Sequence, residues 1–176
     1  MKLRVDDISG EAKEIAFAEG EGTINRTLEA GPVHEFRVAG PVAVDLSYYR
    51  AGTELFFEGE LTAMTAASCA RCAEEFVMPS VRSFRYILVP QALVSSSEER
   101  GDDLEFATYS GDEVDLAPLI QEQVLLALPT RPLCKEDCRG LCPQCGINLN
   151  EHQCDCRAGQ LESRLAVLRT LKLSRN

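Results

Sequence analysis

Eight cysteines in four close pairs constrain this 176-residue chain more than any other feature of its sequence. The N-terminal sequence has no apolar stretch of signal-peptide length, and no run of about 18 apolar residues spans a membrane, so we expect a cytoplasmic protein. In a reducing compartment, close cysteine pairs indicate metal ligands rather than disulfides. The thiolates therefore predict two zinc ions, each held by four cysteines. The pairs are Cys69 and Cys72, Cys134 and Cys138, Cys142 and Cys145, and Cys154 and Cys156.

Loop length favours one of the possible groupings of these pairs. Only residues 146–153 separate the third pair from the fourth, and short loops close at the lowest entropic cost. We therefore expect the third and fourth pairs to share one site, and the first two pairs to share the other. The alternative groupings stay open at this point. Closed four-cysteine sites are usually structural, and Pro143 and Gly146 suit a zinc knuckle around Cys142 and Cys145.

The N-terminal part of the chain predicts a β-rich fold. In residues 54–64, apolar side chains alternate with glutamates, which is typical of a strand with one face toward a core. Cys69 and Cys72 lie between this strand and the next, so we expect them at the tip of an antiparallel hairpin. Pro79 suggests that the second strand is an edge strand or contains a bulge. The expected strands are Val33–Val38, Val42–Leu46, Glu54–Met64 and Phe76–Val89.

Helical patterns follow in the second half. Asp115 can cap a helix that runs to about residue 128, with a wide apolar stripe that packs on the sheet. Residues 91–103 read as a loop, and residues 160–172 as a closing helix. The predicted class is α+β, with an antiparallel β-rich part, one packed helix, a cysteine-rich segment and the closing helix. The expected division is a domain at 1–129 and a zinc-binding segment with the closing helix at 130–176.

The sequence offers little for catalysis. It contains no phosphate loop, dinucleotide fingerprint or serine triad, and its two histidines, His34 and His152, are not needed beside eight cysteines. The spacing of Cys138, Cys142 and Cys145 matches radical-SAM enzymes, but those motifs lie early in a large barrel. A thioredoxin-like pair needs a helix N-terminus, which the strands around Cys69 do not provide. Oxidation of the pairs with release of zinc is the main alternative.

Several motifs together resemble the YceD-like proteins, the bacterial and plastid large ribosomal RNA subunit accumulation proteins. The similar segments are CARCAEEF at 69–76, QEQVLLALPT at 121–130, the cysteine-rich run at 134–150, CDC at 154–156 and the Leu-rich run at 164–172. Glu162 and Ser163 stand where the family usually has Asp-Pro. The resemblance implies a non-enzymatic role in 23S rRNA accumulation and large-subunit assembly, and it carries the cysteines over as metal ligands.

Charge suggests two kinds of partner for such a factor. With 28 acidic and 18 basic residues, the chain has a net charge of −10 and should repel RNA in general. Precursor 23S rRNA could bind a basic C-terminal stretch and cations beside the cysteines, whereas the acidic body suits a basic ribosomal protein. The alternative function is a redox-sensing zinc chaperone. The candidate contact residues are Arg139, Arg157, Arg164, Arg169, Lys172 and Arg175, with Arg71, Arg131 and Lys135 as further candidates.

Overall fold

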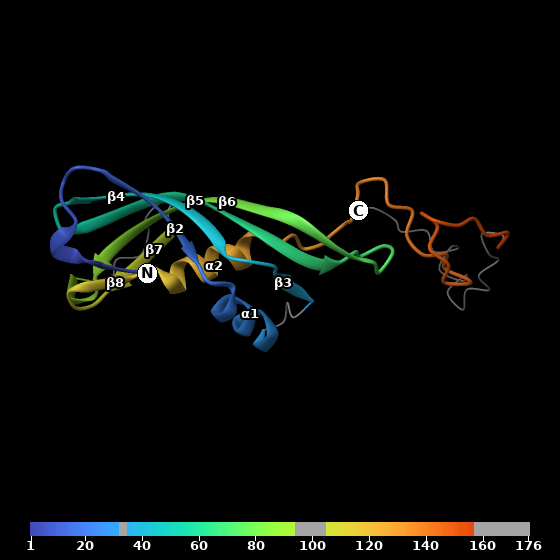
Figure 1. The fold of residues 1–176 in the computed structure, drawn as a ribbon. Helices are drawn as coiled ribbons and strands as arrows, with labels where there is room; N and C mark the ends of the chain where they lie inside the picture. Colours follow the sequence, from blue (N-terminus) through green and yellow to red (C-terminus); the bar gives the residue numbers. More distant parts are fainter. Residues whose placement is uncertain (32–34, 94–104, 157–176) are drawn as a thin grey trace, which may run out of the picture.

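The computed structural model describes residues 1–31, 35–93 and 105–156, and it places most of them around one twisted sheet (Figure 1). Five strands follow the order β2, β4, β5, β6 and β7, and β3 pairs with β5. The pairs are antiparallel except β6 with β7, so the α+β class with a mostly antiparallel sheet is confirmed. The strands are β2 (Lys13–Glu19), β3 (Phe36–Val38), β4 (Val42–Ala51), β5 (Glu54–Ser68), β6 (Glu75–Pro90) and β7 (Glu105–Tyr109).

Strands β5 and β6 form a long hairpin that carries the first cysteine pair away from the rest of the sheet (Figure 1). Their register runs without interruption from Leu55 opposite Leu88 to Ser68 opposite Glu75. Since β5 has 15 residues, it is about 50 Å long. Residues 69–74 form the tip, which confirms the predicted hairpin with Cys69 and Cys72 at its end.

The core lies on one side of the sheet, between the strands and two helices, α1 (Glu21–Ala30) and α2 (Ala117–Ala127) (Figure 1). The predicted alternation in β5 is confirmed, because its apolar positions are buried and its glutamates point to the other face. Helix α2 buries Ile120 and Val124, with buried Leu116 at its N-cap, and helix α1 adds Ile24 and Leu28. The buried β5 side chains are Leu55, Phe57, Leu61 and Ala63.

Helix α2 lies where the sequence predicts, but Leu116 rather than Asp115 is its N-cap residue. The backbone N–H of Ala117 donates to Asp115 Oδ1 at 3.1 Å, and Pro118 occupies the first turn. The helix also buries a polar side chain that the apolar stripe did not reveal, Gln123. Its Nε2 donates to the Tyr86 hydroxyl at 2.6 Å, and its Oε1 accepts from Arg82 Nε at 2.6 Å. These hydrogen bonds attach α2 to β6.

The expectation of a single packed helix was incomplete, because α1 packs on the sheet as well. Its sequence, EGTINRTLEA, contains glycine, asparagine and two threonines, which are weak helix formers. Packing of Ile24 and Leu28 stabilises it instead. Strands β2 and β7 and the two-stranded pair of β1 (Lys2–Arg4) with β8 (Glu113–Asp115) were also not predicted. These strands are short or depend on pairing with distant segments.

Other predicted segments lie only partly within the residues that the structure describes. Pro79 lies where β6 pairs with β5 alone, since β7 pairs only with residues 86–90, so its edge position is confirmed for the described residues. Residues 91–93 form a 3₁₀ turn, and the rest of the predicted 91–103 loop lies outside the described residues. The start of the predicted strand at 33–38, with His34, and the helix at 160–172 also lie outside them.

Candidate metal centres

The first cysteine quartet forms where the hairpin tip meets the chain after α2. Its members, Cys69, Cys72, Cys134 and Cys138, have Sγ atoms within 4.8 Å of one another. Three of the four are at least 96% buried, and Cys134 is half-buried. The backbone N–H of Ala70 donates to the Pro132 carbonyl at 2.9 Å and aligns the two segments. The four thiols therefore come from segments about 60 residues apart and form a closed, mostly dry cluster.

The sulfur separations fit a tetrahedral metal site. Cys69 Sγ lies 3.8 Å from Cys138 Sγ, and Cys72 Sγ lies 3.7 Å from Cys134 Sγ. Four sulfurs about 2.3 Å from one zinc ion are about 3.8 Å apart, whereas a disulfide requires about 2.05 Å. All eight cysteines are free thiols. The donor set and its spacing therefore suit a closed four-thiolate centre.

Backbone geometry holds the tip around this quartet. The N–H of Cys69 donates to the Glu74 carbonyl, and the N–H of Ala73 donates to the Cys69 carbonyl, both at 2.9 Å. Ala73 has a φ of +60°, which is uncommon for a residue with a Cβ. The Arg71 guanidinium donates to the carbonyls of Glu136 at 3.0 Å and Cys138 at 2.9 Å. Arg71 therefore crosslinks the two segments, a role that the sequence did not reveal when it suggested RNA contact.

The second quartet contains Cys142, Cys145, Cys154 and Cys156, again with Sγ atoms within 4.8 Å of one another. The two quartets are thus the ones that loop length favoured. Cys142 is buried, but Cys145 and Cys156 are exposed, so solvent reaches this cluster more easily than the first. The Gly146 N–H donates to the Cys142 carbonyl at 2.9 Å, and Gly146 has a φ of +75°. This is the tight knuckle expected for a Cys-Pro-Gln-Cys-Gly segment.

Within each quartet the thiols differ in acidity. Burial raises the pKa of Cys69, but backbone N–H groups of Cys134, Cys72 and Arg71 more than compensate and lower it to about 6. Burial raises the pKa of Cys134 to about 12. In the second quartet, the N–H groups of Cys145 and Gln144 lower the pKa of Cys142 to about 6. The hydrogen bond with Cys145, followed by burial, raises the pKa of Cys156 to about 12.

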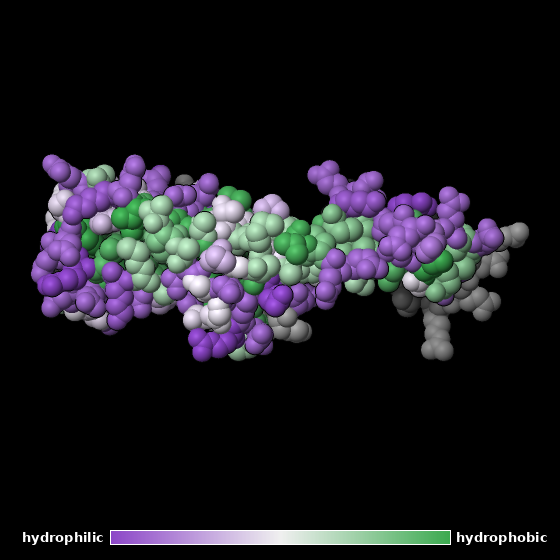
Figure 2. Space-filling view, viewed as in Figure 1, coloured by the Kyte–Doolittle hydropathy of each residue, from purple (hydrophilic) through white to green (hydrophobic). Residues whose placement is uncertain are grey.

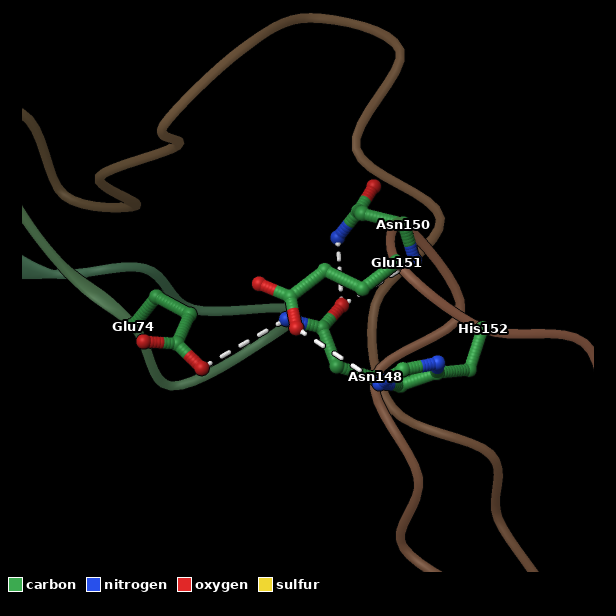
Figure 3. A network of polar contacts seen from close by, with 5 residues as sticks. All are labelled: Glu74, Asn148, Asn150, Glu151 and His152. Carbon is green, nitrogen blue, oxygen red and sulfur yellow. Dashed lines mark hydrogen bonds and ion pairs between the residues drawn. The ribbon is translucent and has the colours of Figure 1, made fainter.

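Neither quartet includes a histidine. His152 is exposed, and its Nε2 lies 3.9 Å from Glu151 Oε2 rather than among the thiols (Figure 3). Among the cationic candidates, Arg131, Lys135 and Arg139 are exposed near the first quartet. The five basic residues from Arg157 to Arg175 lie outside the described part of the chain. The structure therefore brings the cysteines together and leaves the contact residues as predictions.

A comparison with known protein families matches the part of the chain that contains the cysteines. A family model described as large ribosomal RNA subunit accumulation protein YceD matches residues 57–172. That range holds more than half of the chain and all eight cysteines. The chain belongs to the YceD family. No solved structure matches it. In the part of the chain that the structure describes, neither helix has the length and hydropathy needed to cross a membrane.

Curated relatives of this YceD-family chain come from bacteria and plants. A protein of Mycobacterium tuberculosis (strain H37Rv), described as uncharacterized, is 30% identical over 109 residues, which cover 60% of this chain and 50% of the relative. The Arabidopsis thaliana protein described as large ribosomal RNA subunit accumulation protein YCED homolog 1, chloroplastic, is 24% identical and covers 70% of this chain and 46% of the relative. The Zea mays protein of the same description is 22% identical, with 66% and 49% covered. The chain spans about half the length of these relatives.

Proposed function

We propose that the protein is a non-enzymatic, cytoplasmic factor for accumulation of 23S rRNA and biogenesis of the large ribosomal subunit. The family match, which includes every cysteine, is the observation that carries this proposal. The two quartets would each hold a zinc ion as a structural centre, because closed all-thiolate sites leave no open position for a substrate. In this role, Cys69, Cys72, Cys134 and Cys138 hold the hairpin tip against residues 130–138. The other four cysteines fold residues 142–156.

Surface chemistry favours a basic large-subunit protein over precursor rRNA as the direct partner. The face of the sheet opposite the helices exposes Glu14, Asp45 and Glu60 on neighbouring strands, and Glu58 beside them forms an ion pair with Arg85. Farther along the hairpin, the same face exposes Met64, Val77 and Val81, which are 46–55% accessible. Figure 2 shows hydrophobic side chains along the middle of the molecule, and hydrophilic ones over α1 and toward both ends. An acidic and apolar face attracts a basic protein and repels a phosphate backbone.

A deletion strain tests the cellular role. We expect the ratio of 23S to 16S rRNA to fall and to recover with the wild-type gene. A variant with Cys69→Ser and Cys72→Ser should fail to restore it, because the first quartet loses half its ligands. Normal 23S levels in the deletion strain would contradict the proposal. Metal analysis of the purified chain should give about two zinc ions per molecule.

A matched pair of charge reversals tests the partner. Glu60→Lys lies on the acidic face, whereas Glu29→Lys lies exposed on α1, on the helical side of the sheet. Purified large-subunit proteins, titrated one at a time, should bind Glu60→Lys about fivefold more weakly than wild type, since one exposed charge contributes up to about 1 kcal/mol. Glu29→Lys should bind as wild type does. Binding of a precursor 23S fragment, weakened by salt and by loss of Arg139, would identify RNA as the partner instead.

The exposed second quartet supports one other function, a redox-sensing zinc chaperone. Peroxide oxidises two thiols to a disulfide and is itself reduced to two water molecules, which would release zinc. Because Cys145 and Cys156 are exposed and the first quartet is buried, the second zinc should leave first. Retention of both zinc ions under mild peroxide would rule out this function. Release of one zinc, with new exposure of apolar surface, would support it.

A further inference from the structure

We propose that Asn150 couples the two metal centres, so that metal in the second quartet strengthens metal binding in the first. This inference rests on the proposed occupation of both quartets by metal. Asn150 belongs to the 146–153 loop, which joins the two halves of the second quartet. Its side chain nevertheless contacts the first quartet. Nδ2 donates to Cys138 Sγ at 3.3 Å, and Oδ1 accepts from the backbone N–H of Arg139 at 2.8 Å.

The Asn150 amide is held in this position by its own loop. Its Nδ2 also donates to Asn148 Oδ1 at 2.8 Å, and its backbone N–H donates to the same oxygen at 3.0 Å (Figure 3). The amide nitrogen thus contacts two acceptors, one of them a sulfur of the first quartet. Asn148 in turn donates from Nδ2 to Glu74 Oε1 at 3.5 Å, so the loop also contacts the hairpin tip (Figure 3). Figure 3 shows the Asn148 side chain directed from the loop toward Glu74 at the tip, and the Asn150 amide directed toward the Asn148 oxygen.

Backbone hydrogen bonds also connect the loop of the second quartet to the first quartet. The N–H of Leu149 donates to the Gly140 carbonyl at 2.9 Å, and the N–H of Leu141 donates to the Arg71 carbonyl at 3.0 Å. Gly140 lies so close to Arg71 that a Cβ at Gly140 would be 2.9 Å from the Arg71 carbonyl oxygen. The segment between Cys138 and Cys142 therefore lies directly against the tip that supplies Cys69 and Cys72. A change in the loop conformation reaches the first quartet through hydrogen bonds rather than through solvent.

Metal bound in the second quartet would act on the first quartet through these loop contacts. A metal ion bound by both Cys145 and Cys154 closes the 146–153 loop, and the closed loop gives Asn150 fewer accessible conformations. The first quartet then binds metal with its N–H···S partner already in position, which lowers the cost of ordering. Hydrogen bonds to metal-bound ligands typically change metal affinity about 10–100-fold. By linkage, metal in the first quartet must strengthen the second site by the same factor.

A thermodynamic cycle with Co²⁺ as the probe tests this coupling, since tetrahedral thiolate sites give it a distinct absorption spectrum. Affinity of the first quartet is measured in the full chain by competition with a chelator, in four proteins. They are wild type, Asn150→Ala, the second-quartet variant Cys154→Ser with Cys156→Ser, and the combination of all three substitutions. Asn150→Ala and the second-quartet variant should each lower first-quartet affinity about 10–100-fold. The first-quartet affinity of the triple variant should be no lower than that of the second-quartet variant alone.

Controls separate this proposal from general damage and from the metal proposal itself. Gln153→Ala changes an exposed side chain of the same loop and should leave first-quartet affinity unchanged. Asn150→Asp keeps the size of the side chain, removes both donors and adds a negative charge beside the thiolates, so its loss should exceed that of Asn150→Ala. Wild type that binds two metals with multiplicative losses in the combined variant would overturn the coupling alone. If the wild-type protein bound no metal, both the coupling and the zinc proposal would be overturned. The 23S rRNA level in the deletion strain tests the cellular role independently of metal binding.

Discussion

Gly140→Ala should weaken the junction between the two quartets more than any other glycine-to-alanine change near them. Gly140 has a φ of +74°, and this left-handed conformation costs an alanine about 1–2 kcal/mol. The new Cβ would also lie 2.9 Å from the Arg71 carbonyl oxygen and 3.3 Å from Arg71 Cβ. Relief of that contact moves the carbonyl away from its donor, the Leu141 N–H, at a cost of about 1 kcal/mol. The expected total loss in the free energy of unfolding is about 2–3 kcal/mol.

Gly146→Ala is the matched control for this substitution. Gly146 has a φ of +75°, but an added Cβ meets nothing within 4 Å, so it should cost only the backbone share, about 1–2 kcal/mol. The assay is denaturant unfolding of both variants at a fixed free zinc concentration, followed by circular dichroism. Equal losses in the two variants would refute the argument that close approach to Arg71 holds the junction. No loss in either would refute the assignment of left-handed backbone at both positions.

Three further predictions concern the core, the tip and the thiols. Gln123→Ala should lower the free energy of unfolding in urea by about 3 kcal/mol, because it removes one buried and one part-buried hydrogen bond together with buried side-chain volume. A loss below about 1 kcal/mol would contradict the role of this network. Ala73→Gly should raise stability by about 1 kcal/mol, since glycine adopts the φ of +60° without strain, and lower thermal stability would argue against that strain. Metal affinity should rise with pH near 7, because metal must displace protons from the thiols whose pKa is raised, Cys72 and Cys134 in one quartet and Cys154 and Cys156 in the other. Calorimetry in buffers of different ionisation enthalpy should therefore show release of at least two protons per metal at pH 7, and release of none would exclude thiol coordination.

Local patterns predicted the hairpin and α2 because each depends on residues close in sequence. Alternation in residues 54–64 indicates one buried face, and Asp115 followed by an apolar stripe indicates the start of a helix, although Leu116 is the N-cap residue. The same reasoning missed α1, whose residues are weak helix formers and whose stability comes from packing against the sheet. It also missed Gln123, since its polar side chain becomes a core residue only when Tyr86 and Arg82 of β6 supply partners.

The sequence by itself determined the number of thiols, their pairing along the chain and the most economical grouping into quartets, because loop closure depends on chain length alone. Only the tertiary structure decided that the first quartet is mostly buried and the second partly exposed, and that Arg71 donates to the backbone carbonyls of Glu136 and Cys138. It also decided that Asn150, from the loop of one quartet, donates to a sulfur of the other. The burial of the first quartet and the contacts of Arg71 arise when the β5–β6 hairpin brings its tip to a segment more than 60 residues farther along the chain. A contact at that separation leaves no local pattern in the sequence.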